Sequence, residues 1–172
     1  GVGAVGLQLK SMAENGRTVS QVTEAFKSLA AAQKQNYDVM LTEGRKATRG
    51  LVSDFDLMAA GNKAMLLGLP ITAREMGILS GASVTLGQAM NQGPTKSLND
   101  LITGLSRGSA QILDNLGIVV KAKAAHEAYA ASIGKSASDL TEAEKKTAVY
   151  NAALTAMAQN VAIVNGKAIP KA

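Results

Sequence analysis

Residues 53–90 read SDFDLMAAGNKAMLLGLPITAREMGILSGASVTLGQAM, and this stretch contains the start of one helix, its end and the start of the next. Ser53 begins a capping sequence, in which a hydroxyl accepts a hydrogen bond from a free backbone amide. Gly68 and Pro70 then favour a helix end, because glycine adopts the terminal left-handed conformation and proline cannot continue a helix. Thr72 and Glu75 match the capping box of a second helix. The stretch therefore predicts two successive helices with a short connection.

Similar signals recur along the rest of the chain. Capping boxes also predict helix starts at Thr18 and Thr141, and Pro94 suits a first helical turn. Glycines at which a helix could end are Gly16, Gly50, Gly68, Gly93, Gly117 and Gly134. We predict an all-α fold with one long entering helix, Thr18–Thr48, of about 45 Å at 1.5 Å per residue. About five shorter capped helices are expected to follow, with an oligomeric bundle as one arrangement.

Apolar side chains recur between these signals at the three- and four-residue steps of a helix. The rows expected to face a core are Val19, Val22, Phe26 and Leu29; Leu51, Phe55, Met58, Asn62, Met65 and Leu69; Met76, Leu79, Ser83, Leu86 and Met90; Leu98, Leu101, Leu105 and Ile112; Val119, Ala122, His126, Tyr129 and Ile133; and Leu140, Ala143, Thr147, Tyr150, Leu154, Met157 and Val161. The step through Gln33 and Tyr37 is interpreted as a stutter within the long helix. A break is expected near Gly104 and Gly108.

Composition limits the classes of function. Hydrophobic residues make up 47% of the chain, but aromatic residues only 3%. Because aromatic side chains contribute strongly to core packing, burial against copies or partners is expected to add stability. The absence of cysteine excludes disulfides and thiolate chemistry. The net charge of +5 comes from basic residues spread along the chain, which favours solvated helix faces over a nucleic-acid patch. The best apolar run, Ala64–Ile71, is too short to span a bilayer.

Four short motifs resemble functional sequences, but each lacks a required element. Gly1–Gly6 spells GxGxxG without a preceding strand, and Gly134–Ser136 resembles a phosphate loop whose first glycine would be Tyr129. His126 begins HExxH but is the only histidine, and Ser132–Lys135 fits SxxK without its companion motifs. We therefore predict that the chain is not an enzyme and has no catalytic residues, metal site or cofactor. His126 is expected to be packed or half-buried, with pH sensing as the functional alternative.

Three ordered stretches resemble the tail tape measure proteins of long-tailed phages. They are ATRGLVSDFDLM at 47–58 with NKA at 62–64 and LLGLPIT at 66–72; LITGLSRGS at 101–109 with ILDNLGI at 112–118; and YA at 129–130 through Gly134 with LTEAEK at 140–145. The resemblance covers roughly residues 45–160. The family's usual glycine at position 49 is Arg49 in this chain.

The resemblance implies a structural protein of the virion tail that helps to set tail length during tail assembly and assists genome ejection. Such proteins lie in the lumen of the tail tube in a few parallel copies. The implied partners are other copies of the chain, the tail tube protein, tail-tip or baseplate proteins and, at ejection, the host membrane. The expected organisation is an N-terminal helical segment (1–50), a helical module that resembles the family (51–160) and a tail (161–172).

Three alternatives stay open. The first is a helical tail-tip plug or interaction adaptor, for which methionines at 58, 65, 76, 90 and 157 would offer an adaptable surface if they lay outside the core. The second is membrane action during DNA ejection through Val2–Leu9 and Ala64–Ile71, favoured by positive charge. The third is a fragment of a cell-wall hydrolase, which no visible acid–base pair or zinc set supports.

Overall fold

The computed structural model describes the backbone of residues 2–165 and the side chains of residues 16–159. Within that range the chain forms eight α-helices, one short 3-10 helix and no strand, which confirms the predicted all-α fold. The elements are α1 (Val2–Ala32), α2 (Tyr37–Thr48), α3 (Asp54–Leu66), α4 (Ala73–Ala89), α5 (Pro94–Arg107), α6 (Ala110–Asn115), α7 (Ala122–Ser132), η1 (Ala137–Asp139) and α8 (Glu142–Asn165).

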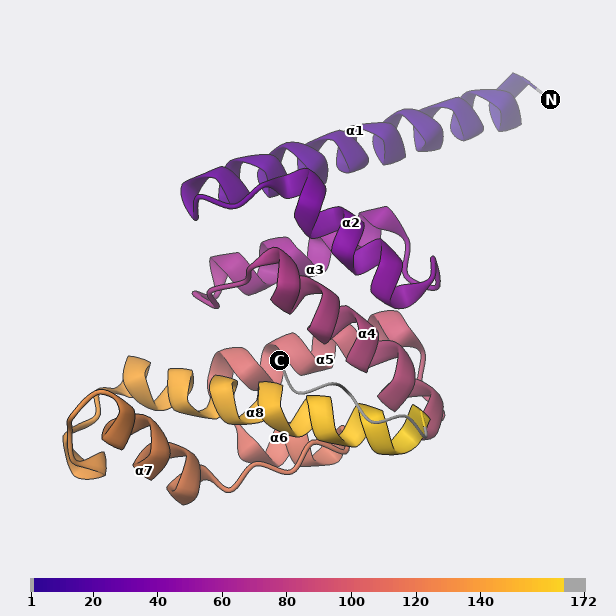
Figure 1. Cartoon of the computed structure of the whole chain (residues 1–172). Coiled ribbons are helices and arrows are strands. Elements are labelled where there is room, and N and C mark those ends of the chain that lie inside the picture. The colour runs from indigo at the N-terminus through magenta and orange to yellow at the C-terminus, as the bar shows by residue number, and fades with distance from the viewer. Residues whose placement is uncertain (1, 166–172) are drawn as a thin grey trace.

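The helices are stacked from one end of the molecule to the other (Figure 1). Helix α1 lies at one end, and its N-terminal half extends beyond the helices beneath it. Helices α2 to α5 form the middle of the stack, where α2 packs on α4. Helix α1 joins this middle part by packing on α3. Helix α8 contacts α4, α5 and α7 and so connects the middle to the opposite end. A single hydrophobic core runs through the stack, from Phe26 to Met157.

This core is built from aliphatic and methionine side chains, with few aromatic ones. Phe26 and Tyr150 are the buried aromatic residues among the described side chains. Four methionines on the predicted rows are buried, whereas Met90 is 52% exposed. The four buried methionines are Met58, Met65, Met76 and Met157, and all of them belong to the hydrophobic core. The predicted rows contain fewer than half of the buried hydrophobic residues, and the buried residues that they missed include Leu57, Ile102, Leu113 and Ile118.

Two predicted capping boxes are present with both of their hydrogen bonds. Thr72 Oγ1 accepts from the Glu75 amide at 3.2 Å, and Glu75 Oε2 accepts from the Thr72 amide at 3.0 Å. Thr141 and Glu144 repeat the arrangement at the start of α8. Ser53 caps α3 through the amide of Asp56 at 3.1 Å. These helix starts are confirmed.

The single long helix Thr18–Thr48 is wrong. Helix α1 already runs through Gly16 and Thr18 and ends at Ala32, so neither residue marks a helix boundary. The chain then turns with Lys34 at a φ of 58°, and the Asn36 side chain caps α2 by accepting from the Val39 amide at 3.1 Å. The apolar steps at Gln33 and Tyr37 therefore mark a break between two helices and not a stutter.

Three other expectations need correction. Seven helices follow α1 in the described part of the chain, because α2 and the six-residue α6 are separate elements. The buried positions of α7 are Ala125 and Ala130, whereas Val119 and Ile133 of the predicted row are exposed. The helical pattern persists to Asn165, beyond the expected start of the tail; residues 166–172 of that tail lie outside the described residues. The expected break is confirmed at Gly108, where α5 ends in a left-handed cap.

We predict that Arg49→Gly stabilises the protein. Arg49 caps the C-terminus of α2 at a φ of 52°, a conformation that disfavours any residue with a Cβ by about 1–2 kcal/mol relative to the right-handed region. Glycine removes this cost but gains freedom in the unfolded chain, so we expect a net gain of about 1 kcal/mol in the free energy of unfolding. Guanidinium titration measures it. Gly50→Ala, which places a Cβ at a φ of 77°, should act in the opposite direction, and a destabilised Arg49→Gly variant would contradict the assigned turn.

Tyr150 makes stability depend on alkaline pH. Its hydroxyl is buried close to the Glu75 carboxylate, and burial, followed by the charge of Glu75, raises the pKa of Tyr150 far above its ordinary value. The unfolded chain therefore loses this proton near pH 10 while the folded protein keeps it, so stability falls as pH rises above about 10. We expect Tyr150→Phe to weaken this fall and to change stability little at neutral pH. Unfolding titrations at about pH 8 and about pH 11 measure both effects, and equal alkaline losses in the two proteins would contradict the prediction.

Candidate functional site

The described part of the chain offers no obvious metal centre. No group of three or more His, Cys, Asp or Glu side chains lies together there in a way that could hold a metal ion. Among the described helices, none combines the length and the apolar character that a bilayer crossing requires. Individual motifs, hollows and exposed surfaces are therefore the remaining candidates for a functional site in the described residues.

The motifs around α7 have structural roles in this fold. His126 is half-buried on α7, as expected, and the adjacent Glu127 is exposed. Gly134 follows the end of α7 at a φ of 71°, a conformation suited to glycine. Lys135 Nζ lies 2.9 Å from Glu144 Oε1, so it connects the loop to the capping box of α8. The Gly134–Ser136 sequence thus marks a helix end whose lysine pairs with a carboxylate.

Ion pairs tie neighbouring helices together on the surface. Arg45 on α2 donates two hydrogen bonds to the Asp54 carboxylate at the start of α3, at 2.9 and 2.8 Å. This contact lowers the pKa of Asp54, chiefly through its hydrogen bond from Arg45. A hydrogen bond from Lys96 likewise lowers the pKa of Asp100 within α5. Each of these exposed ion pairs contributes little to the free energy of unfolding.

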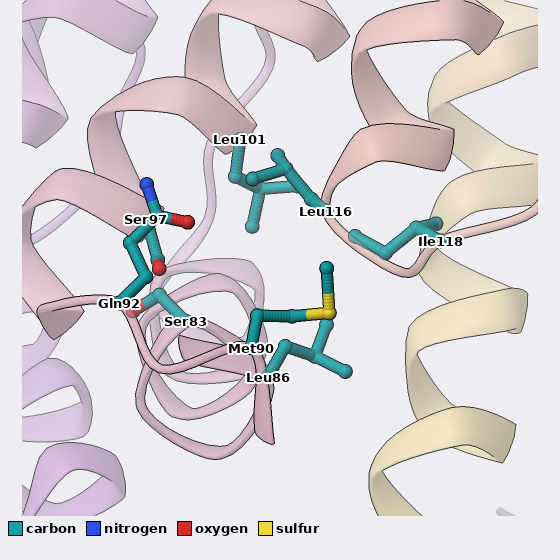
Figure 2. A pocket seen from close by; sticks show the side chains of 8 residues that line it. All are labelled: Ser83, Leu86, Met90, Gln92, Ser97, Leu101, Leu116 and Ile118. Carbon is teal, nitrogen blue, oxygen red and sulfur yellow. The ribbon is translucent and has the colours of Figure 1, made fainter. Parts of the chain in front are cut away.

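A small pocket lies between α4, α5 and the loop after α6 (Figure 2). Its volume of about 10 Å³ is near that of one water-sized probe, so no organic substrate fits. Leu86, Leu101 and Ile118 make most of its wall apolar, and Ser97 Oγ is buried beside it without a hydrogen-bond partner. The pocket can hold about one water molecule and has no catalytic arrangement.

An open groove of about 670 Å³ runs between α2 and α4. Glycines of α4 let the two helices approach closely here: a Cβ built on Gly77, which lines the groove, would lie 3.5 Å from the Glu43 carbonyl oxygen, and one on Gly81, one turn further along α4, would lie 3.4 Å from the Ala47 Cβ. The rim carries Lys46 and Arg74, which are exposed cations. Sequence reasoning missed this groove, although the glycines spaced four apart in α4 were a signal for close helix approach.

A second groove, of about 260 Å³, lies between α7 and α8. Its walls are again mostly small side chains, with Tyr129 as the largest residue. This groove and the α2–α4 groove are separate and shallow. Each therefore suits contact with another protein better than the binding of a small molecule, which usually needs an enclosed pocket.

Exposed apolar side chains gather near helix ends. Leu66 and Leu67, at the end of α3, are 72% and 51% exposed. Others with more than about two-fifths of their surface exposed are Val19, Val39, Leu51, Met90, Val119 and Ile133. Leu66 and Leu67 belong to the apolar run Ala64–Ile71, in which Ala64, Leu69 and Ile71 are buried. That run therefore divides into a core part and an exposed tip.

Helix α1 docks on the module through its C-terminal half. Phe26 is completely buried, and a Cβ on Gly61 of α3 would lie only 2.8 Å from its ring. The Asn62 side-chain amide donates to the Val22 carbonyl at 3.1 Å. Residues 16–20 are all exposed, so the contact with α3 ends near Val22.

Comparison with known proteins found no matching family model, no matching curated protein and no matching solved structure.

Proposed function

We propose that this chain is a non-catalytic structural segment of a phage tail tape measure protein. In this proposal it lies in the tail tube lumen or at the tail tip of the virion, helps to set tail length and assists genome ejection. Its partners are parallel copies of itself, the tail tube protein and tail-tip or baseplate proteins.

The observation that carries the proposal is the backbone conformation at position 49. Tape measure proteins usually have glycine at this point of the resembling stretch, and Arg49 has a φ of 52° here. Glycine adopts this left-handed conformation without strain, whereas residues with a Cβ do not. The family's usual glycine therefore fits the local geometry of this chain at position 49, which supports the resemblance.

The other resembling stretches also fall where helices begin and end. Residues 66–72 contain the turn before the Thr72 cap, and residues 101–109 contain the Gly108 cap between α5 and α6. Residues 140–145 contain the capping box of α8. The resemblance is therefore concentrated in residues that determine the fold, as expected for a shared structural module without a shared catalytic site.

The shape of the chain supports two roles within this function. The helices from α2 to α8 share one core and form a stack that suits docking against tail-tip or tube proteins. Helix α1 has 31 residues, so it spans about 45 Å and suits a rod-like continuation from that module.

In-frame deletion of residues 2–32 from the parent phage gene tests the measuring role. If α1 contributes to the ruler, mean tail length in electron micrographs should fall by about 45 Å. Phe26→Ala is the matched control, because it loosens the docking of α1 without shortening the chain and should leave tail length unchanged. Normal lengths after the deletion would refute a measuring role for α1. Deletion of residues 37–159 should abolish tail assembly if this part docks.

A second candidate function is that of a tail-tip plug with membrane activity during ejection. It is favoured by Leu66 and Leu67, which expose apolar side chains at the end of α3. Leakage of anionic vesicles, compared between the natural protein and a Leu66→Ser/Leu67→Ser variant, tests this function. Absence of leakage at every lipid composition would rule it out.

A further inference from the structure

We propose that the groove between α2 and α4 is a docking surface for one amphipathic helix of a partner protein, with acidic residues on both sides of its apolar row. This inference deepens the docking role in the proposed function by naming the surface and the chemistry of the partner. It rests on that function only for its biological setting.

Helices α2 and α4 pack side by side and run in the same direction (Figure 1). A Cβ built on Gly77 would lie 3.6 Å from the Glu43 Cβ, and one on Gly81 would lie 3.4 Å from the Ala47 Cβ, so successive turns of the two helices lie level with each other. With its lining residues from Val39 to Ala47, the groove runs for about 12 Å along the helices. This length suits a docked helix that inserts side chains at positions i, i+4 and i+7.

The groove offers apolar surface that the described residues leave open to solvent. Val39 is 47% exposed, Ala47 is exposed and Ile78 is half-buried. An apolar row of a partner helix would remove these side chains from water, which is the usual driving force for a helix in a groove. A nucleic acid is a poorer match, because its phosphates gain nothing from an apolar surface and need more cations than line this groove.

The charges of the groove favour an acidic partner. Arg74 on the α4 wall is exposed and forms no ion pair among the described residues. It lies in the first turn of α4, where the partial positive charge of the helix terminus disfavours a cation, so it does not stabilise its own helix. Lys46 on the α2 wall is 72% exposed, and its ion pair with Glu43 is long, at 3.8 Å. The two cations stand on opposite walls, so they match carboxylates on both sides of one helix.

The direction of α2 and α4 also predicts the orientation of the docked helix. Their N-termini, at Tyr37 and Ala73, lie at the same end of the groove and carry partial positive charge. The negative C-terminal end of a docked helix is stabilised at that end, so the partner should run antiparallel to both. A spin label at the C-terminal end of the bound helix should broaden the amide resonances of residues 37–40 and 73–76. A label at its N-terminal end should broaden those of residues 45–48 and 80–83.

NMR titration of the full chain with synthetic helical peptides tests the inference. The probe is an 18-residue peptide with leucines at i, i+4 and i+7 and glutamates on both sides of that row, and a covalent staple keeps it helical because short isolated helices are marginal in water. The control peptide has the same composition, with its glutamates on the face opposite the leucines. We expect the probe to bind with a dissociation constant of about 100 μM and to shift amides of α2 and α4, and the control to bind at least about tenfold more weakly.

Charge reversal on the protein completes the test. Lys46→Glu/Arg74→Glu should weaken binding of the probe by more than about tenfold, because both walls would then repel it. Lys121→Glu/Lys123→Glu, which makes the same change in net charge at exposed positions near the start of α7, should bind the probe like the natural chain.

Several results would overturn the inference. They are no binding of the probe at about 1 mM, equal binding of the two peptides, shifts confined to residues outside α2 and α4, or binding that survives the reversal of Lys46 and Arg74. Tighter binding of a 20-base-pair DNA duplex at the same residues, or self-association of the full chain through them, would also overturn it. Peptide binding reads only the groove, whereas tail length in the phage reads the proposed function, so the two failures are distinguishable.

Discussion

Phe26→Ala should release α1 from the module and lower the free energy of unfolding by about 3–5 kcal/mol, the usual cost of removing a buried phenylalanine. Phe26 is completely buried and lies over Gly61 of α3, where a Cβ would come within 2.8 Å of its ring. Truncation to alanine leaves a cavity between α1 and α3 at this point, and the cavity adds to the loss of buried apolar surface.

Hydrogen exchange on the same variant tests where the stability is lost. Amides of residues 22–32 should exchange faster, whereas amides of α4 and α5 should keep most of their protection, because α4 packs chiefly on α2, α5 and α8, and α5 chiefly on α4. Ser28→Ala, an exposed change on the same helix, serves as the control and should alter stability by less than about 0.5 kcal/mol. Unchanged exchange of α1 in the Phe26→Ala variant would refute this docking mode.

Gly87→Ala should destabilise the turn between α4 and α5 by about 1–3 kcal/mol through overpacking. A Cβ at this position would lie 2.8 Å from Ser97 Oγ and 2.9 Å from the Gln92 carbonyl oxygen. The second contact is the more costly, because it involves backbone of a turn in which the Gln92 amide already donates to the Gly87 carbonyl at 2.7 Å. The turn must open to admit the methyl group.

Gly81→Ala provides a matched control on the same helix. Its Cβ would make an ordinary contact with the Ala47 Cβ at 3.4 Å, so the gain in helix propensity should leave stability equal or slightly higher. Adding Ser97→Ala to Gly87→Ala should recover part of the loss, because it removes one of the two clashes. Guanidinium unfolding measures all four proteins, and a Gly87→Ala variant as stable as Gly81→Ala would contradict the assigned packing.

Helix starts were predictable where the signal is local and complete. At Thr72 a hydroxyl and a glutamate three residues later follow Pro70, and at Thr141 they follow Leu140 in an extended conformation, so the chain has left the preceding helix and the box decides the start. At Thr18 the same pattern lies inside α1, because the preceding residues are helical and the threonine backbone cannot adopt the extended conformation of a cap. A capping pattern is therefore informative only together with the sequence before it.

Three features depended on information that single residues do not carry. The break before α2 uses Lys34 in a left-handed conformation, which is rare for lysine, and the Asn36 side chain then caps the new helix. The buried face of α7 consists of Ala125 and Ala130, which a search for large apolar side chains does not find. The α2–α4 groove depends likewise on glycine contacts between helices that are distant in sequence. Tertiary packing of small residues decided the last two of these features.

Small-angle X-ray scattering with mass determination on the full chain tests most directly whether the region from α2 to α8 is a folded docking module. A compact fold of this length has a radius of gyration of about 16 Å, whereas 172 residues in one continuous helix would extend for about 260 Å. We expect a particle dominated by a compact body for each copy, with one thin extension of about 45 Å or less from α1. A rod-shaped particle whose length approaches that of the continuous helix would contradict the folded module and the docking role that depends on it.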